Sequence, residues 1–515
     1  MRIKLVTLFG MLLAYGALRS QAPPASSARI DVSTQLPNGP RMPARIYLFK
    51  DNQPFRLQPV QATLPIKSDL FYRDRLWMDG SSPDVLEVIC NDEYHYFLLK
   101  GAATFHLPPG KYRMEAYRGF FYTPAKQEFE VKADQTLPVS LTLQSWDGAN
   151  PGDWISADDH IHLTRTPREN SVYSAWLEAE DLNIAHFLAL QRKSDAASQY
   201  AFGRAGQFQQ RGYTIRSGQE TRNQRFGHIL MLGADKLVRP MSTGAELANT
   251  PEDYPFHSLL FDLARSAGAL TGYAHFRERP RNTTLYMDLA LGKLQFIELF
   301  QFGVLTVEPW YELLNAGFKL APMAGSDFPV YVQRLKPYPR WVPLFGPERA
   351  MVKAKAGEDP FAAWAAGVRE GRVMVSNGPV VEIEIEAGRV KAKAAFWRPL
   401  LELEIIRNGM MVARVNGSGT TKLEAAVPTM EGENAWYAAR VQARREEGEP
   451  EIQAHTSPVY VGQRAIQKDV RRAIAAAWEA ELSRYRQLGL VFARPEHQRE
   501  FFDAGERALA ELRRP

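Results

Sequence analysis

Two histidines stand one residue apart, behind two aspartates, in the stretch "SADDHIHLTR" from Ser156 to Arg165. If this stretch forms a strand, the side chains of His160 and His162 point to one face, roughly 6–7 Å apart, with Asp158 in step with them. Two imidazoles and a carboxylate on one face can hold a metal ion such as zinc, manganese or iron. A polar loop is the other interpretation of the same residues, so the rest of the chain has to decide.

Four more residues with metal-binding side chains lie beside predicted apolar strands. Glu220 precedes His228 by eight residues, and His228 begins the apolar run "HILML". His275 follows the run "LTGYA", and Asp327 follows "LAPMA" after a Gly-Ser turn. In folds that alternate strands and helices, active-site residues gather at the carboxyl ends of the strands. The order of these residues after the His-x-His pair therefore predicts one metal site.

The elements that must position these residues change character along the chain. Short apolar strands alternate with helical segments over 150–378, which predicts βα units in a parallel sheet or barrel. One of the helices is "DPFAAWAAGVREG", residues 359–371, with an Asp start and a Gly stop. The predicted fold class is multidomain, α/β plus β.

The flanks of this α/β region have a different pattern. Residues 28–146 and 379–462 alternate as strands do and predict two β-sandwich-like domains, the second with an Asn408-Gly409 hairpin turn. In the first, the turn "LPPGKY" resembles secreted prealbumin-like and carboxypeptidase-regulatory-like modules, which bind or pack rather than catalyse. Residues 465–515 predict a helical tail whose apolar stripe packs on the protein: Val470, Ile474, Trp478, Leu482 and Tyr485.

The first residues predict export. Arg2 and Lys4 precede the apolar run "LVTLFGMLLAYGAL", and small and polar residues follow. This is typical of a signal peptide over residues 1–22, cleaved near Ala17 or Ala22, with an uncleaved anchor as the alternative. Cys90 is the only cysteine, so no internal disulfide forms and no thiolate pair binds metal. We expect a periplasmic or extracellular protein without stable membrane insertion after cleavage.

The ordered set Asp158-x-His160-x-His162, Glu220, His228, His275 and Gly325-Ser326-Asp327 resembles the polymerase and histidinol phosphatase (PHP) superfamily. It resembles the CehA/McbA-type metallohydrolases more closely, as do the segment "GRVMVSNGP", residues 371–379, and the flanking β regions. The resemblance covers residues 150–380 best. It implies a distorted (β/α)7 barrel with a metal cluster at its C-terminal mouth.

The resemblance also implies a ligand set. By the family's pattern, His160, His162 and Asp327 hold one divalent ion, and Glu220 bridges it to a second ion that His228 and His275 complete. Zinc, manganese or iron suits these ligands, and two such ions lower the pKa of a shared water. Asp158 either accepts a hydrogen bond from a histidine N–H or faces solvent at the end of its strand.

Three ligands of the family's third metal are absent. No third histidine follows the His-x-His pair closely, and the other two positions read Leu190-Gln191-Arg192-Lys193 and Phe328-Pro329. Their joint loss favours a two-metal site. Arg192 or Lys193 is our hypothesis for the missing positive charge, which would orient a substrate anion. A solvated basic loop is the alternative, and the same choice applies to three further residues: Arg222, Arg225 and Arg277.

The sequence thus predicts an exported hydrolase in which Glu220 and two metals activate a water that cleaves an ester, amide, carbamate or phosphoester bond. Arg192 is expected to stabilise the oxyanion, and Tyr273 or a protonated histidine to act as general acid. His186 and His257 are assigned to structural roles.

Two alternatives stay open: a phosphoesterase, and a non-catalytic exported protein that binds a glycan or cell-wall polymer on the same scaffold. The expected substrate is a small molecule or a piece of a polymer. The formal net charge of +5 without a long basic run does not predict nucleic acid as a partner.

Overall fold

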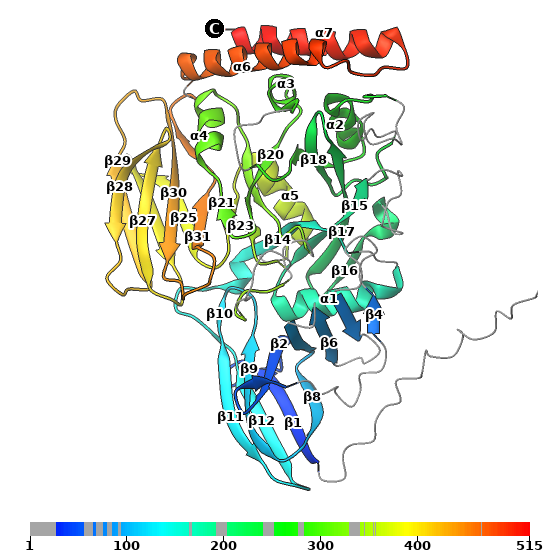
Figure 1. Ribbon diagram of the computed structural model, residues 1–515. Helices are drawn as coiled ribbons and strands as arrows, with labels where there is room; N and C mark the ends of the chain where they lie inside the picture. Colours follow the sequence, from blue (N-terminus) through cyan, green and yellow to red (C-terminus); the bar gives the residue numbers. More distant parts are fainter. Residues whose placement is uncertain are drawn as a thin grey trace, which may run out of the picture.

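The computed structural model describes residues 27–55, 65–67, 76–79, 85–90, 94–163, 167–191, 203–239, 252–276, 283–328, 340–344, 346–353, 355, 357–464 and 466–514. The expected signal peptide, 1–22, lies outside the described residues, and so do Arg192, Lys193 and Arg277. Figure 1 shows a β-rich N-terminal region in blue and cyan below a central α/β region in green. A second β region in yellow and orange flanks the centre, and two long helices in red cover its far end.

Two larger sheets and the short two-stranded sheet β10-β13 form the N-terminal region. One has the strand order β12-β1-β8 and the other β11-β9-β2-β7-β6-β5-β4. Ile30 and Phe105 of the first sheet pack in the same core as Ile46 and Met114 of the second, so the sheets face each other. The strands are β1 (Ala28–Gln35), β2 (Ala44–Lys50), β3 (Gln53–Pro54), β4 (Pro65–Lys67), β5 (Leu76–Asp79), β6 (Val85–Cys90), β7 (Tyr94–Leu99), β8 (Ala102–Leu107), β9 (Gly110–Tyr117), β10 (Tyr122–Thr123), β11 (Ala125–Val131), β12 (Thr136–Thr142) and β13 (Gln144–Ser145).

The central region contains the predicted βα units. Helix α1 connects the parallel strands β14 and β15, α3 connects β19 and β20, and α4 connects β20 and β22. The elements are η1 (Pro151–Asp153), β14 (Trp154–Ile161), η2 (Pro167–Glu169), α1 (Asn170–Glu180), β15 (Ile184–Gln191), η3 (Gly203–Gly206), β16 (Phe208–Gln210), β17 (Tyr213–Asn223), β18 (Gly227–Leu232), α2 (His257–Ser266), β19 (Leu270–Tyr273), α3 (Leu285–Ala290), β20 (Phe296–Gln301), β21 (Val304–Leu305), α4 (Glu308–Asn315), β22 (Ala321–Ala324), β23 (Arg349–Lys353), α5 (Pro360–Glu370) and β24 (Met374–Ser376).

In the series β14, β15, β17, β18, β19, β20 and β22, one strand departs from the parallel arrangement that the alternation predicts. β18 runs antiparallel to both of its neighbours, β17 and β19. The reason is the short connection: only residues 224–226 separate β17 from β18, which is enough for a hairpin but not for a crossover. Because of this reversal, His228 near the start of β18 lies at the same edge as the end of β17.

The chain after β22 returns to the first strand of this region. The strands pair in the order β14, β15, β17, β18, β19, β20 and β22, and Phe328 then forms a parallel bridge with Ile161. The backbone N–H of His162 also donates to the carbonyl oxygen of Phe328 at 2.8 Å. This return brings the Gly-Ser-Asp turn beside the His-x-His pair.

Local sequence signals set the helix that precedes β24. The Asp359 side chain accepts a hydrogen bond from the Ala362 N–H at 2.8 Å and caps the start of α5. Gly371 ends the helix in the left-handed conformation, with φ of 70°. Both ends confirm the prediction for residues 359–371.

The C-terminal β region continues the central sheet. β24 pairs with β23 on one side and with β31 on the other, and the sheet extends through β30 and β27 to β28. A three-stranded sheet, β25-β26-β29, packs against it. Asn408 and Gly409 turn the hairpin between β27 and β28 with positive φ, as predicted. The strands are β25 (Val380–Glu386), β26 (Arg389–Ala395), β27 (Leu400–Arg407), β28 (Met410–Asn416), β29 (Lys422–Pro428), β30 (Ala435–Ala443), β31 (Ile452–Thr456) and β32 (Val459–Val461).

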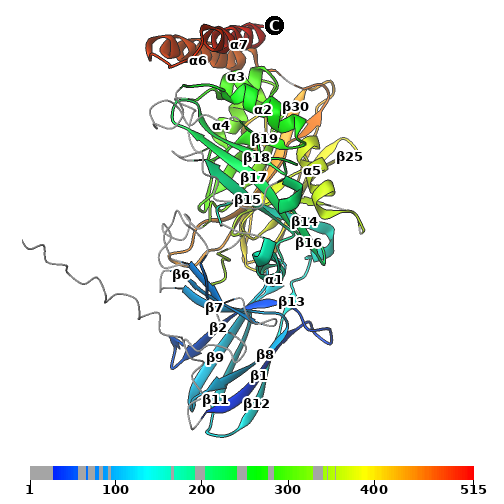
Figure 2. The same ribbon diagram turned by 90° about the vertical axis from the view of Figure 1, so that its right-hand side faces the viewer.

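The helical tail consists of α6 (Lys468–Gln487) and α7 (Pro495–Arg513). Figures 1 and 2 show both helices lying across the end of the central region, beside α3. Ile474, Trp478, Leu482 and Tyr485 are buried in a core shared with α2, α3 and α4, which confirms the packing role predicted for this stripe. Among the described residues, no helix is both long and apolar enough to span a membrane.

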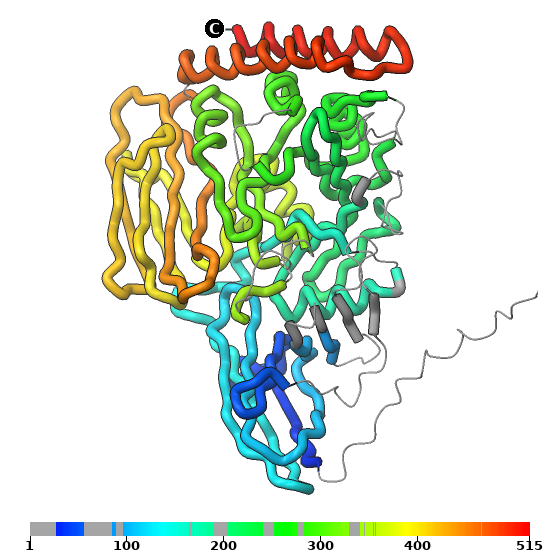
Figure 3. The backbone as a smooth tube through the Cα atoms, in the orientation of Figure 1, coloured from blue at the N-terminus to red at the C-terminus, as the bar shows by residue number. Residues whose placement is uncertain are grey.

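Buried arginines join the N-terminal region to the end of α1. Arg45 Nη1 donates to Glu180 Oε1 at 2.9 Å, and only 1% and 0% of the two side chains are exposed. Arg118 pairs with Asp181 at 2.8 Å and donates to the carbonyl of Glu178. The last of these contacts satisfies a backbone carbonyl group at the end of the helix. Figure 3 shows the N-terminal region, in blue and cyan, below the helix that Figure 1 labels α1.

Candidate metal centre

The end of β14 carries the His-x-His pair, and both imidazoles are buried. The Nε2 atoms of His160 and His162 lie 3.1 Å apart, so the two rings point to one place as the spacing predicts. The Asp158 carboxyl group contacts backbone N–H groups and Ser326 instead of the imidazoles, and the pairing of β14 with β15 shifts register between Asp158 and Ile161. Such an irregularity re-aims side chains at the end of a strand.

Asp158 organises the backbone around the pair. Its carboxyl oxygens accept the N–H of His160 at 3.1 Å and of Gly346 at 3.1 Å, and both the N–H and the Oγ–H of Ser326. The side chain is fully buried, so it does not face solvent, and its recorded partners include no imidazole N–H. Burial raises the pKa of Asp158 to about 6, against the hydrogen bonds from Ser326 and His160, which lower it.

The Gly-Ser-Asp turn after β22 brings Asp327 to the pair. A Cβ on Gly325 would lie 2.1 Å from Asp159 Oδ1 and 2.5 Å from the His160 Cβ, so only glycine allows this approach. Asp327 then adopts a positive φ of 50° and places its Oδ1 3.1 Å from His162 Nε2 and 3.6 Å from His160 Nε2. His160, His162 and Asp327 together form a group that can hold a metal ion.

Glu220 lies between this group and a second one. On the first side, its Oε2 is 3.1 Å from His162 Nε2 and 3.6 Å from His160 Nε2. On the second side, its Oε1 is 3.2 Å from His228 Nδ1 and 3.2 Å from His275 Nε2. Glu220, His228 and His275 form a further group with metal-binding geometry.

Strand pairing explains how the second group assembles. Glu220 and Arg222 are two residues apart on β17 and share a face, and His228 on β18 is the direct partner of Arg222. His275 follows β19 by two residues and has a positive φ of 43°. Its backbone N–H donates to Glu298 Oε2 at 2.6 Å, which holds this uncommon conformation.

The proposed ligand atoms fit a cation. Within the described residues, the buried side-chain atoms without a hydrogen-bond partner include four proposed ligand atoms, Glu220 Oε1, His228 Nδ1, His275 Nε2 and Asp327 Oδ1, besides His162 Nδ1 and both carboxyl oxygens of the neighbouring Asp159. Buried polar atoms without a partner are rare in folded proteins and call for an explanation. All six side chains that the sequence analysis assigned to metal meet here, and a metal ion at each group would satisfy these four atoms.

The charges of the carboxyl groups suit metal binding. Burial disfavours ionisation of Glu220, but Arg222, His160 and His162 outweigh it and hold its pKa well below the ordinary value. For Asp327, the same two histidines overcome the effect of burial and lower the pKa to about 2. Both carboxylates are therefore ionised at neutral pH, as metal ligands must be.

Sequence reasoning missed Glu298, which is fully buried in β20. Its Oε1 lies 3.1 Å from His160 Nδ1, on the opposite side of the ring from His162 and Asp327. A carboxyl group at this position fixes the tautomer and orientation of a metal-binding histidine. The available signal was a single charged residue inside the apolar run "FIELF". Glu298 also forms a metal-capable group with His160 and His275.

Arg222 and Arg225, the two named basic residues that the structure describes, have different surroundings. Arg222 Nε donates to Glu220 Oε2 at 2.7 Å, and its Nη2 lies 3.8 Å from Asp327 Oδ1, so this residue belongs to the centre. Arg225 instead lies 3.7 Å from Asp253, and its Nη1 donates to the carbonyl of Leu488 beside the helical tail. The hypothesis about Arg192 concerns a residue outside the described ranges.

Tyr273, one of the two expected general acids, has the hydrogen-bond partners of its hydroxyl outside the proposed ligand set. Its hydroxyl donates to Asp288 Oδ2 at 2.8 Å and lies 3.0 Å from Thr284 Oγ1 and 3.2 Å from His257 Nδ1. Burial and the neighbouring Asp288 raise the pKa of Tyr273 well above its ordinary value. Tyr273 precedes His275 by two residues, but its side chain belongs to a buried network under α2 and α3.

The two histidines to which the sequence analysis assigned structural roles are both fully buried. His186 is buried against Phe361 and Trp364, and burial lowers its pKa to about 3. His257 is buried in the Tyr273 network, and burial lowers its pKa to about 3 as well. Both imidazoles are therefore neutral at physiological pH.

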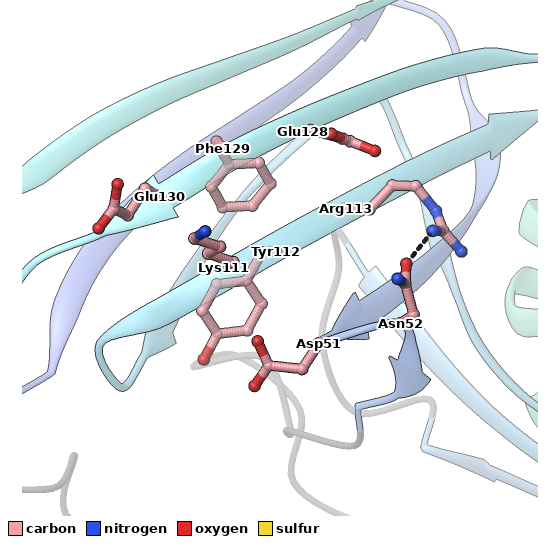
Figure 4. A pocket seen from close by; sticks show the side chains of 8 residues that line it. All are labelled: Asp51, Asn52, Lys111, Tyr112, Arg113, Glu128, Phe129 and Glu130. Atoms are coloured by element: carbon pink, nitrogen blue, oxygen red, sulfur yellow. Dashed lines mark hydrogen bonds between the residues drawn. The ribbon is translucent and has the colours of Figure 1, made fainter.

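A pocket in the N-terminal region is separate from the metal centre. Figure 4 shows this pocket on the face of the paired strands β9 and β11, beside Asp51 and Asn52. Its volume is about 580 Å³, and the rings of Tyr112 and Phe129 stack at 5.7 Å on its floor. Arg113 Nη1 donates to Asn52 Oδ1 at 2.5 Å on its wall. None of the residues that line it belongs to the candidate metal groups.

Comparisons with known proteins give only weak likenesses. No family model and no curated protein matches the chain. One similar solved structure is an endonuclease Q complex with a 27-mer duplex substrate carrying an abasic lesion, with 13% identity and a TM-score of 0.25. It covers 41% of this chain, and the match spans 57% of its own length.

Two further solved structures are similar to the same degree. PsfC from Pseudomonas syringae PB-5123 has 14% identity and a TM-score of 0.26, with 40% of this chain and 85% of that chain covered. The lesion-specific endonuclease PfuEndoQ from Pyrococcus furiosus has 13% identity and a TM-score of 0.25, with 42% and 56% covered. Two of the three structures are thus nucleases, but similarity this low carries no inference about this chain.

Proposed function

We propose that this protein is a metal-dependent hydrolase with a binuclear centre. The observation that carries the proposal is the position of Glu220, whose two carboxyl oxygens face two different groups of metal-binding side chains. A carboxylate placed in this way can bridge two ions roughly 3.5–4 Å apart. Four buried ligand atoms without hydrogen-bond partners among the described residues support the same interpretation.

In this proposal each side chain has a defined task. His160, His162 and Asp327 would hold one ion, His228 and His275 would hold the other, and Glu220 would contribute one carboxyl oxygen to each. Two divalent ions at these groups supply Lewis acidity and lower the pKa of water at the attacked bond. Glu298 holds His160 Nδ1 on the side of the ring that faces away from the centre, so His160 Nε2 points into the centre. Zinc, manganese and iron all suit these nitrogen and oxygen ligands.

The finer assignments belong to this proposal too. The ring-like order of β14, β15, β17, β18, β19, β20 and β22 supports the distorted (β/α)7 barrel of the PHP superfamily, and the ordered ligand set supports the CehA/McbA type. The scissile bond is an ester, amide, carbamate or phosphoester in a small molecule or a polymer fragment. The N-terminal sequence supports export to the periplasm or the exterior.

The proposal is tested by hydrolysis assays on protein loaded separately with zinc and with manganese. Aryl carboxylic esters, amides, carbamates and phosphomonoesters should include at least one substrate that the wild type cleaves. Glu220→Gln should lower kcat/KM for that substrate by at least about a hundredfold, because the amide bridges two cations poorly. Turnover that Glu220→Gln leaves intact would contradict the proposal, as would full metal loading without turnover of any of these bonds, which is the result expected of a binding protein.

A further inference from the structure

Arg222 is the one described basic residue in contact with both the bridging carboxylate and the first metal group. Its Nε donates to Glu220 Oε2 at 2.7 Å, and its Nη2 lies 3.5 Å from His162 Nε2 and 3.8 Å from Asp327 Oδ1. The side chain is 21% exposed, whereas Glu220 is fully buried. The guanidinium therefore lies between the metal ligands and solvent.

The position of Arg222 is fixed by its strand and not by a loop. Arg222 and Glu220 alternate on the same face of β17, and Arg222 pairs directly with His228 of β18. A solvated basic loop, the alternative interpretation of this residue, does not describe a side chain anchored in this way. Arg222 is held at the outer edge of the centre whatever else binds there.

Metal binding changes the partners that Arg222 can keep. Glu220 Oε2 and Asp327 Oδ1, which the guanidinium now approaches, are the atoms that face the first metal group. Two divalent ions outweigh the negative charge of these two carboxylates and repel a guanidinium at this distance. The long side chain is partly exposed and can turn toward solvent, while its strand keeps its backbone beside the centre.

We propose that Arg222 binds a negatively charged group of the substrate at the mouth of the metal centre, and that the centre therefore prefers anionic substrates. The shared chemistry is a pair of anionic oxygens, on a phosphoryl group or on a carboxylate, which a guanidinium binds through two parallel N–H donors. This inference rests on the proposed binuclear centre. It adds the residue that selects the charge of the substrate.

The test is calorimetric titration of zinc-loaded protein with inorganic phosphate and, in a separate arm, with acetate. Arg222→Met should weaken the binding of the preferred anion about ten- to a hundredfold, the loss expected for a charge-assisted hydrogen bond. Arg222→Lys keeps the charge without the fork of donors and should lose less. Arg204→Met removes a charge that is 81% exposed and paired with Asp235, and it should bind both anions as the wild type does.

Elemental mass spectrometry of the same samples separates the possible failures. An Arg222→Met protein that holds two ions and binds phosphate and acetate like the wild type overturns this inference and leaves the binuclear centre standing. If the wild type holds one ion and Arg222→Met holds two, the inference about Arg222 is also overturned, because the guanidinium then takes the place of a metal ion. A folded wild type that binds no metal overturns both proposals.

Discussion

Replacing Glu298 by glutamine should weaken metal binding about ten- to a hundredfold in a protein that still folds. Glu298 is fully buried, and its two oxygens serve both metal groups: Oε1 lies 3.1 Å from His160 Nδ1, and Oε2 accepts the backbone N–H of His275 at 2.6 Å. Glutamine has one acceptor oxygen and one NH₂ group. One oxygen must then serve both the His160 Nδ1 and the His275 N–H, which two carboxyl oxygens share in the wild type, so the support that directs the histidines to their ions weakens.

The assay is competition for Zn²⁺ or Co²⁺ against a chromophoric chelator, with circular dichroism and thermal melting of the metal-free proteins as folding checks. Glu348→Gln is the matched control. Glu348 is also fully buried, accepts the Gly303 N–H, and burial raises its pKa to about 8, so glutamine changes little charge at pH 7. A folded Glu298→Gln protein with wild-type metal affinity, or an equal loss in Glu348→Gln, would refute the reasoning.

Three other predictions concern residues outside the ligand set. Tyr273→Phe should leave kcat/KM nearly unchanged in the hydrolysis assay, but should lower the unfolding free energy by about 1–2 kcal/mol, because Asp288 and Thr284 lose a buried partner; a loss of turnover without a loss of stability would restore its role as an acid. Burial raises the pKa of Asp288 to about 7, so the folded state keeps a proton that the unfolded state releases near pH 4. The stability contributed by this group therefore falls as the pH rises from about 4 to about 7. Asp288→Asn should remove that part of the pH dependence of the unfolding free energy, measured by urea titration at several pH values; an unchanged pH dependence contradicts the assignment. Arg45→Met leaves the buried Glu180 carboxyl without its ion pair and should cost about 3–5 kcal/mol in urea unfolding, whereas a cost below about 1 kcal/mol would show that the N-terminal region is not fixed by this pair.

Spacing rules account for the part of the site that the sequence predicts. The pair His160 and His162 needs only the alternation of a strand, and Asp327 needs the Gly-Ser turn that brings it to them. Glu220 and His228 meet although β18 is antiparallel, because a hairpin brings the end of one strand beside the start of the next. These relations are local or follow from strand order.

Other features depend on contacts that no spacing reveals. Tyr273 has the sequence position of an active-site residue, two before His275, but its side chain points into the Asp288 network. The partners of the Asp158 carboxyl, Ser326 and the Gly346 N–H, lie more than 160 residues away in the chain, so its spacing from the histidines does not reveal them. Glu298 lies 138 residues from His160 in the chain, and their contact depends on how the strands are ordered around the centre.

The central claim, a binuclear centre on these six side chains, is tested most directly by metal content. Elemental mass spectrometry should find about two divalent ions per wild-type chain after loading with zinc or manganese. The double variant His160→Ala/His162→Ala should hold fewer ions. The control His497→Ala removes a partly exposed histidine of α7 that pairs with Glu252, and it should hold as many ions as the wild type. A folded wild type that takes up no metal, or a double variant that still holds two ions, would contradict the account.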